Sequence, residues 1–131
     1  GLVMGRGSFL NVLSLGEWPY HKPVVVMSRS LTVEDIPDHL RDKVQRSSQE
    51  PEALMQALDK EGWKRACIYG GKLVQSFLRA GLIFDITLTR VPILIGEGLP
   101  LFGCIDHDID LEHVYTESFA SGLVTSKYRI I

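Results

Sequence analysis

The sequence contains few cysteines, no excess of basic residues and no long apolar run. Its two cysteines, Cys67 and Cys104, form neither a CxxC pair nor the larger set of thiols that a disulfide framework requires. We therefore expect a chain that folds without disulfides in a reducing compartment, the cytoplasm. No apolar stretch approaches the ~20 residues that span a bilayer, so we expect no contact with the membrane interior.

The charge balance argues against nucleic acid as a partner. The 14 basic and 16 acidic residues give a formal net charge of -2, and no run of lysines and arginines stands out. Nucleic-acid binding needs a basic patch that neutralises phosphates. With 45% hydrophobic and 23% charged residues among 131, the chain has the composition of one folded domain, residues 1–131.

The sequence also lacks a recognisable set of catalytic side chains. Acidic residues and histidines gather between Asp106 and His113, but their alternation into a strand divides them between two faces, so we expect no metal site. Cys67 lies in an apolar segment without a nearby partner, and no serine lies in a GxSxG motif. The catalytic residues therefore stay unassigned, and any chemistry belongs to a bound cofactor.

The stretch from Ile68 to Leu78 is a short strand that passes through Gly70 and Gly71 directly into a helix. Two residues without side chains let the backbone approach a ligand closely, and the free amides at a helix N-terminus favour an anion such as phosphate. A tight strand-to-helix turn with no ligand is the simpler interpretation of a bare Gly-Gly pair. The motif alone leaves both interpretations open.

Two further strand ends carry groups that suit a phosphate. A strand at Leu2 to Met4 leads through a glycine-flanked Arg6 into a helix, where a guanidinium and helix amides converge. The apolar run Val24 to Met27 ends in Ser28 and Arg29, at the strand end where open α/β sheets bind ligands. The alternatives are a surface ion pair for Arg6 and a solvated turn after Met27.

Hydrophobic periodicity predicts the remaining elements of an α/β fold. The polar segment from Thr32 to Ser48 indicates a surface excursion with at most a short strand, and the sheet is expected to be mostly parallel with an antiparallel C-terminal hairpin. The other predicted elements are a helix over Pro51 to Lys60, a strand over Arg65 to Tyr69, a central strand over Ile83 to Pro92 extended by Ile93 to Ile95, a loop over Gly96 to Gly103, and hairpin strands over Leu111 to Phe119 and Leu123 to Ile130.

Several of these motifs resemble one family in their order and spacing. The stretches are Val3 to Phe9, Val25 to Ser30, Ile68 to Leu78, Gly81 to Asp85, Val91 to Gly103 and Ser121 to Tyr128. Together they resemble the dihydrofolate reductase-like superfamily, and most closely the reductase C-terminal domain of the bifunctional riboflavin-biosynthesis deaminase/reductase and stand-alone bacterial proteins like it. The resemblance implies a three-layer fold, in which the family's first strand would precede Gly1.

The resemblance implies NADPH as the cofactor, bound across the carboxyl edge of the sheet. Arg29 suits a dianionic 2′-phosphate better than a neutral hydroxyl, which favours NADPH over NADH. The residues that the resemblance assigns to the cofactor are Gly5, Arg6, Gly7, Ser8, Met27, Ser28, Arg29, Tyr69, Gly70, Gly71, Lys72, Leu73 and Val74.

The resemblance also implies a reaction and an assembly. Ile68 and Thr89 match positions that line the pocket of the reducible ring, and Tyr69 replaces the first of three glycines usual in dihydrofolate reductases, which argues against folate. The implied function is hydride transfer from NADPH to a small heterocycle, a pteridine or a ribosylaminopyrimidine-like compound. A non-catalytic nucleotide-binding or dimerisation domain with a degenerate substrate site is the alternative. A homodimer, formed through the terminal hairpin or a sheet edge, is expected.

Overall fold

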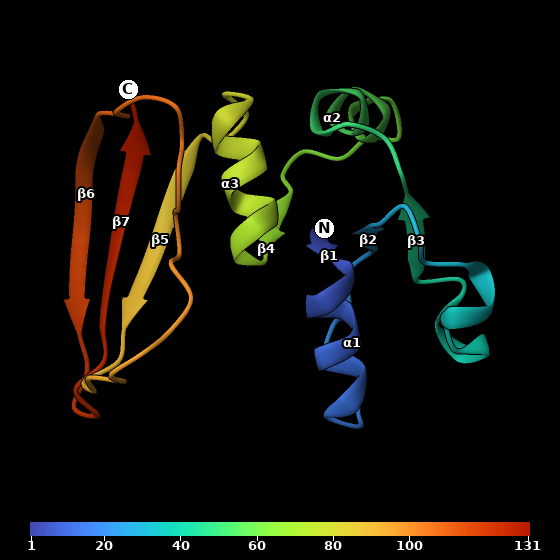
Figure 1. Ribbon diagram of the computed structural model, residues 1–131, viewed down its shortest axis with the longest axis horizontal. Coiled ribbons are helices and arrows are strands. Elements are labelled where there is room, and N and C mark those ends of the chain that lie inside the picture. The colour runs from blue at the N-terminus through green and yellow to red at the C-terminus, as the bar shows by residue number, and fades with distance from the viewer.

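The computed structural model describes residues 1–131 as two sheets flanked by helices (Figure 1). The predicted helix over Pro51–Lys60 and the C-terminal hairpin are confirmed. The elements are β1 (Leu2–Gly5), α1 (Arg6–Ser14), β2 (Val24–Met27), the 3-10 helices η1 (Val33–Asp35) and η2 (Asp38–Leu40), β3 (Val44–Ser47), α2 (Pro51–Lys60), β4 (Cys67–Tyr69), α3 (Gly71–Arg79), β5 (Asp85–Arg90), β6 (Leu111–Ser118) and β7 (Val124–Ile130).

The first sheet is parallel, with the strand order β3-β2-β1-β4. Its register places Gly5 of β1 beside Met27 of β2, and Met27 beside Ser47 of β3. On the other side of β1, Met4 pairs with Tyr69 of β4. Because the strands run parallel, all four carboxyl ends meet at one edge of the sheet.

Alternating side chains of the parallel sheet build a core on each of its faces. Met4 of β1 packs on one face with Phe9 of α1, while Val3 packs on the other with Leu58 of α2 and Phe77 of α3. Val3, Phe9 and Phe77 are fully buried. The predicted three-layer arrangement, helices on both faces of the sheet, is therefore confirmed.

The second sheet is antiparallel, with the order β5-β7-β6. We expected the strand over Ile83 to Pro92 in the centre of the parallel sheet, but β5 pairs with β7 instead, and no hydrogen-bonded ladder joins it to β4. The periodicity that predicts a strand does not determine its partner, because an alternating strand fits a parallel or an antiparallel neighbour.

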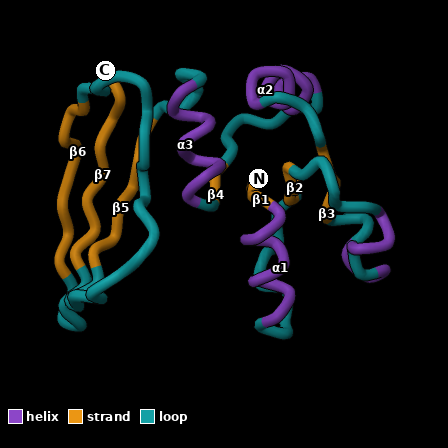
Figure 2. Tube along the Cα trace, viewed as in Figure 1, coloured by secondary structure: helices purple, strands orange, loops and turns teal.

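The strand also ends earlier than we expected. β5 stops at Arg90, and the Ile93 amide donates to the Val91 carbonyl at 2.8 Å, which closes a tight turn around Pro92. Leu94 is 98% exposed, so the apolar residues Ile93 to Ile95 do not extend a buried strand. Figure 2 shows that the segment between β5 and β6 forms neither helix nor strand.

None of the helices has the length and apolar character needed to cross a membrane.

Candidate functional site

The three predicted groups of phosphate-binding residues lie at the same edge of the parallel sheet. Ser47, Met27 and Gly5 form a row across β3, β2 and β1, and Gly70 follows directly after the end of β4. Neighbouring strands lie ~4.8 Å apart, so the row extends over about 14 Å. An extended ligand along this edge reaches all three groups.

Gly70 has the backbone geometry that the central motif predicts. Its φ is 103° and its ψ is 128°, a conformation that favours glycine. The Val74 amide donates to the Gly70 carbonyl at 2.9 Å, so the amides of Gly71, Lys72 and Leu73 precede the first hydrogen bond within α3. These three N–H groups, together with the positive end of the helix, are available to an anion.

The starts of α1 and α3 lie against each other. A Cβ atom placed on Gly70 meets the Ser8 hydroxyl oxygen at 2.9 Å, and one placed on Gly71 lies 3.7 Å from the Leu101 carbonyl oxygen. The adjacency follows from the pairing of β1 with β4, because each strand leads directly into its helix. The predicted residues of the first and third motifs are therefore brought together in one place.

Arg6 is the first residue of α1 and is exposed. It makes no ion pair in this structure, so the alternative of a surface ion-pair partner has no support. Its charge has a small effect on a neighbouring loop. Hydrogen bonds from the Thr32 amide and hydroxyl hold the pKa of Asp35 below its usual value, and Arg6 adds a smaller contribution.

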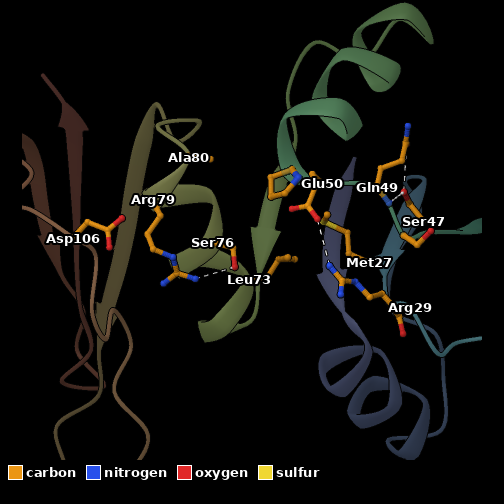
Figure 3. Close-up of a pocket in the computed structure, with 13 residues that line it drawn as sticks. Met27, Arg29, Ser47, Gln49, Glu50, Leu73, Ser76, Arg79, Ala80 and Asp106 are labelled. Carbon is orange, nitrogen blue, oxygen red and sulfur yellow. Dashed lines mark hydrogen bonds and ion pairs between the residues drawn. The ribbon is translucent and has the colours of Figure 1, made fainter.

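A polar cavity of about 560 Å³ lies beside the ends of β2 and β3. Figure 3 shows Arg29 and Glu50 facing each other on one side of it, with Arg79 on the opposite side. An Arg29 guanidinium nitrogen lies 3.4 Å from a Glu50 carboxylate oxygen, and both side chains are largely exposed. Arg79 donates to the Ser76 hydroxyl and to the Cys104 carbonyl, at 3.3 and 3.1 Å.

Ser28 serves the local turn as well as the cavity. Its hydroxyl oxygen accepts hydrogen bonds from the amides of Ser30 and Leu31, at 3.2 and 3.0 Å. This is the pattern of a serine-stabilised turn, so the alternative interpretation of this segment, a solvated turn after Met27, also has support. The turn directs Arg29 toward the cavity.

An apolar groove of about 630 Å³ separates β4 from β5. Of the 20 residues that line it, 14 are hydrophobic, and Ile68 is among them. Thr89 is not. Its hydroxyl forms a hydrogen bond of 2.9 Å with the Thr125 hydroxyl on β7, so the structure does not bring Thr89 and Ile68 together.

Both sides of this groove are unpaired strand edges. The Cys67 amide donates to the Gly1 carbonyl, so the backbone of Ile68, next along β4, faces away from β1. The Ile130 amide donates to the Phe84 carbonyl, so the backbones of Thr87 and Thr89 face away from β7. A salt bridge of 3.2 Å between Arg65 and Asp85 connects the two sides.

Tyr69 stands where the groove meets the glycine motif. Its ring lies 6.5 Å from the ring of Tyr20, and its side chain is 46% exposed. Partial burial, with smaller contributions from Cys67 and Tyr20, raises the pKa of the Tyr69 phenol above its usual value. The phenol is therefore protonated at neutral pH and can donate a hydrogen bond.

Residues 3–125 match the RibD C-terminal domain. The chain belongs to the RibD C-terminal domain family. A Shewanella sp. PV-4 protein named for riboflavin biosynthesis superposes with a TM-score of 0.93 at 35% identity, over 100% of this chain and 73% of that one. The fold is the predicted dihydrofolate reductase-like α/β fold.

Two other proteins extend the comparison. A pyrimidine reductase-like protein of Corynebacterium diphtheriae shares the fold with a TM-score of 0.68 and 19% identity, over 100% of this chain and 75% of that one. The uncharacterized protein YyaP of Bacillus subtilis is 38% identical over 72 residues, 54% of this chain. That match spans only 38% of the length of YyaP.

Membership of the RibD C-terminal domain family supports a reductase-like role. The residues along the sheet edge fit a phosphorylated dinucleotide in three respects: the free amides of α3, the positive φ of Gly70 that brings these amides to the sheet edge, and the guanidinium of Arg29 beside a polar cavity. No group of three or more histidine, cysteine or acidic side chains is close enough to hold a metal ion. Cys67, which lies in the predicted apolar segment, is exposed along the groove.

The sequence analysis missed several residues of the polar cavity. Ser47, Ser48 and Gln49 line it directly after β3, and Ser76 and Arg79 line it from α3. Ser47 and Ser48 carry the same signal as Ser28, hydroxyls at the end of a parallel strand. The signal is weak in the sequence because β3 is only four residues long and lies in a polar segment.

Proposed function

We propose that this RibD C-terminal domain binds NADPH along the carboxyl edge of its parallel sheet and acts as a reductase on a small heterocycle, a pteridine or a ribosylaminopyrimidine-like compound. The observation that carries the proposal is the row formed by Ser47, Met27, Gly5 and Gly70. This row would place two separate anion sites on one edge of the sheet. Arg29 would hold the 2′-phosphate, and the amides after Gly70 with Arg6 would hold the pyrophosphate.

The bound cofactor would supply the hydride, and the chain would position it. From the pyrophosphate site, the ligand would continue past Tyr69 to the mouth of the apolar groove. Apolar walls keep water away from the reacting ring, and a fixed orientation lowers the entropy cost of the transfer. The protonated phenol of Tyr69 would donate a hydrogen bond at the mouth of the groove. Catalysis by this chain would therefore consist of binding and orientation.

NADPH titration followed by thermal unfolding tests the proposal. We expect NADPH at 100 times its dissociation constant to stabilise the protein by about 2.7 kcal/mol, and NADPH oxidation to require a pterin, folate or aminopyrimidine acceptor. Binding without oxidation on any acceptor would favour a non-catalytic nucleotide-binding domain. An unchanged melting temperature would contradict both functions.

We further propose that the groove between β4 and β5 receives one extended strand, the first strand that the family resemblance places before Gly1. The groove has apolar walls and an unpaired strand edge on each side, at Ile68 and at Thr87, so an inserted strand can form hydrogen bonds to both. One continuous sheet would result, and the wall of the substrate site would be completed.

Amide hydrogen exchange on the purified natural protein, with its native N-terminus, tests this insertion. If a strand fills the groove, the amides of Ile68 and Thr87 exchange as slowly as those of paired residues in β7. The amide of Cys67, which already donates to the Gly1 carbonyl, serves as the matched control. Fast exchange at Ile68 and Thr87 beside slow exchange at Cys67 would contradict the proposal.

We also propose a homodimer formed through the terminal hairpin. β6 is the edge strand of the second sheet and is exposed along its whole length, and Leu111, Val114, Tyr115 and Phe119 are between 41% and 45% exposed. An exposed edge strand with apolar side chains is a preferred site of association.

A charge introduced on β6 is expected to dissociate this dimer. Tyr115→Glu places a carboxylate on the proposed contact and should shift the protein to monomer at micromolar concentration, as measured by light scattering. Leu15→Glu is the matched control, because Leu15 is 81% exposed at the end of α1, away from β6. A monomeric wild type, or a dimer unaffected by Tyr115→Glu, would show that the hairpin is not the interface.

A further inference from the structure

Arg29 does not face the polar cavity alone. Glu50 lines the same cavity, and its carboxylate lies 3.4 Å from the Arg29 guanidinium. Glu50 is the N-cap residue of α2, but its side chain caps no amide of the helix. Its position beside Arg29 therefore has no explanation in the capping of α2.

We infer that Glu50 sets the preference of this site between a 2′-phosphate and a 2′-hydroxyl. The inference rests on the proposed function, because it concerns the same adenosine end of the dinucleotide. A 2′-phosphate bound to Arg29 must lie close to the Glu50 carboxylate, and two anions at that distance repel. A 2′-hydroxyl donates a hydrogen bond, and a neighbouring carboxylate accepts it. Glu50 therefore opposes NADPH and favours NADH, while Arg29 does the reverse.

The Glu50 carboxylate also competes with a bound phosphate for the Arg29 guanidinium. Both side chains are mostly exposed, 85% and 77%, so the pair itself contributes little to stability. Releasing Arg29 from Glu50 consequently costs little when a phosphate competes for the guanidinium. The site binds NADPH with less selectivity than Arg29 alone would give.

Dissociation constants of the Glu50→Gln variant for NADPH and NADH test the inference. We expect NADPH to bind about 3- to 10-fold more tightly than in the wild type, with NADH unchanged or weaker. The gain should shrink at 1 M salt, where the screening length falls to ~3 Å. Glu52→Gln is the matched control: Glu52 lies in the first turn of the same helix, is exposed and does not line the cavity.

The possible outcomes separate the two proposals. A wild type that binds neither cofactor contradicts the proposed function. A wild type that binds NADPH, with the same ratio of NADPH to NADH affinity in Glu50→Gln, overturns the role of Glu50 alone. Weaker NADPH binding in Glu50→Gln also overturns it, because that result means Glu50 assists the phosphate by holding Arg29 in position. An equal change in Glu52→Gln would assign the effect to the net charge of the helix end.

Discussion

Replacing Arg29 with alanine is expected to weaken NADPH binding about 10- to 100-fold and to change NADH binding by less than about threefold. Arg29 lines the polar cavity at the end of β2 and is 85% exposed, so its removal leaves no unpaired buried group and no void in the core. The loss is then that of a charge-assisted contact with a dianion, which NADH does not carry. Fluorescence titration with both cofactors measures the difference.

The adjacent strand offers a control for Arg29→Ala. Arg46 lies on β3, is exposed and does not line the cavity, so Arg46→Ala removes the same charge without touching the proposed phosphate site. We expect this variant to bind both cofactors as the wild type does. Equal losses for NADPH and NADH in Arg29→Ala would show that Arg29 does not bind the 2′-phosphate.

The sequence predicted the parallel half of the fold because its signals are local. Val24 to Met27 is an apolar run that ends in a polar turn, and Gly70 and Gly71 mark a strand that leads into a helix. Each of these patterns depends on a few neighbouring residues. Once the strands are taken as parallel, their carboxyl ends must meet at one edge, so the grouping of Arg6, Arg29 and Gly70 could be predicted as well.

The partner of β5 could not be predicted in the same way. Its alternating residues identify a strand, but whether that strand joins β4 or β7 depends on contacts far along the chain. The side-chain direction of Thr89 depends on the same choice. Because β5 pairs with β7, the Thr89 hydroxyl meets Thr125 rather than the groove. Register across a sheet is a tertiary property, and periodicity determines it only where one face is clearly buried.

The cavity residues after β3 could not be predicted from the sequence for a different reason. Ser47, Ser48 and Gln49 reach the cavity because β3 pairs with β2 in register, with Met27 opposite Ser47. The segment before them is polar, and of the four residues of β3 only Val44 is buried. A strand with so little apolar pattern resembles a surface loop, and its contribution to the site becomes visible only when its neighbour is known.

Replacing Gly70 with alanine is expected to abolish tight binding of both cofactors, with losses of about 30-fold or more for NADPH and NADH alike. The φ of 103° is unfavourable for alanine, and the new Cβ would lie 2.9 Å from the Ser8 hydroxyl oxygen. The Ser8 side chain can rotate away, so the backbone strain of ~1–3 kcal/mol dominates. We expect the segment to relieve it by rotating the amides of Gly71 to Leu73 away from the proposed pyrophosphate site.

Gly62→Ala is the control that distinguishes the effect of backbone strain at Gly70 from an effect on the proposed phosphate site. Gly62 has a φ of 92°, and a Cβ added there would meet nothing within 4 Å. It lies between α2 and β4 and is not part of the proposed site. Both variants should lose a similar part of their unfolding free energy, but only Gly70→Ala should lose cofactor affinity. If Gly70→Ala is destabilised and still binds NADPH and NADH as tightly as Gly62→Ala, the glycine serves the turn between β4 and α3 and holds no phosphate.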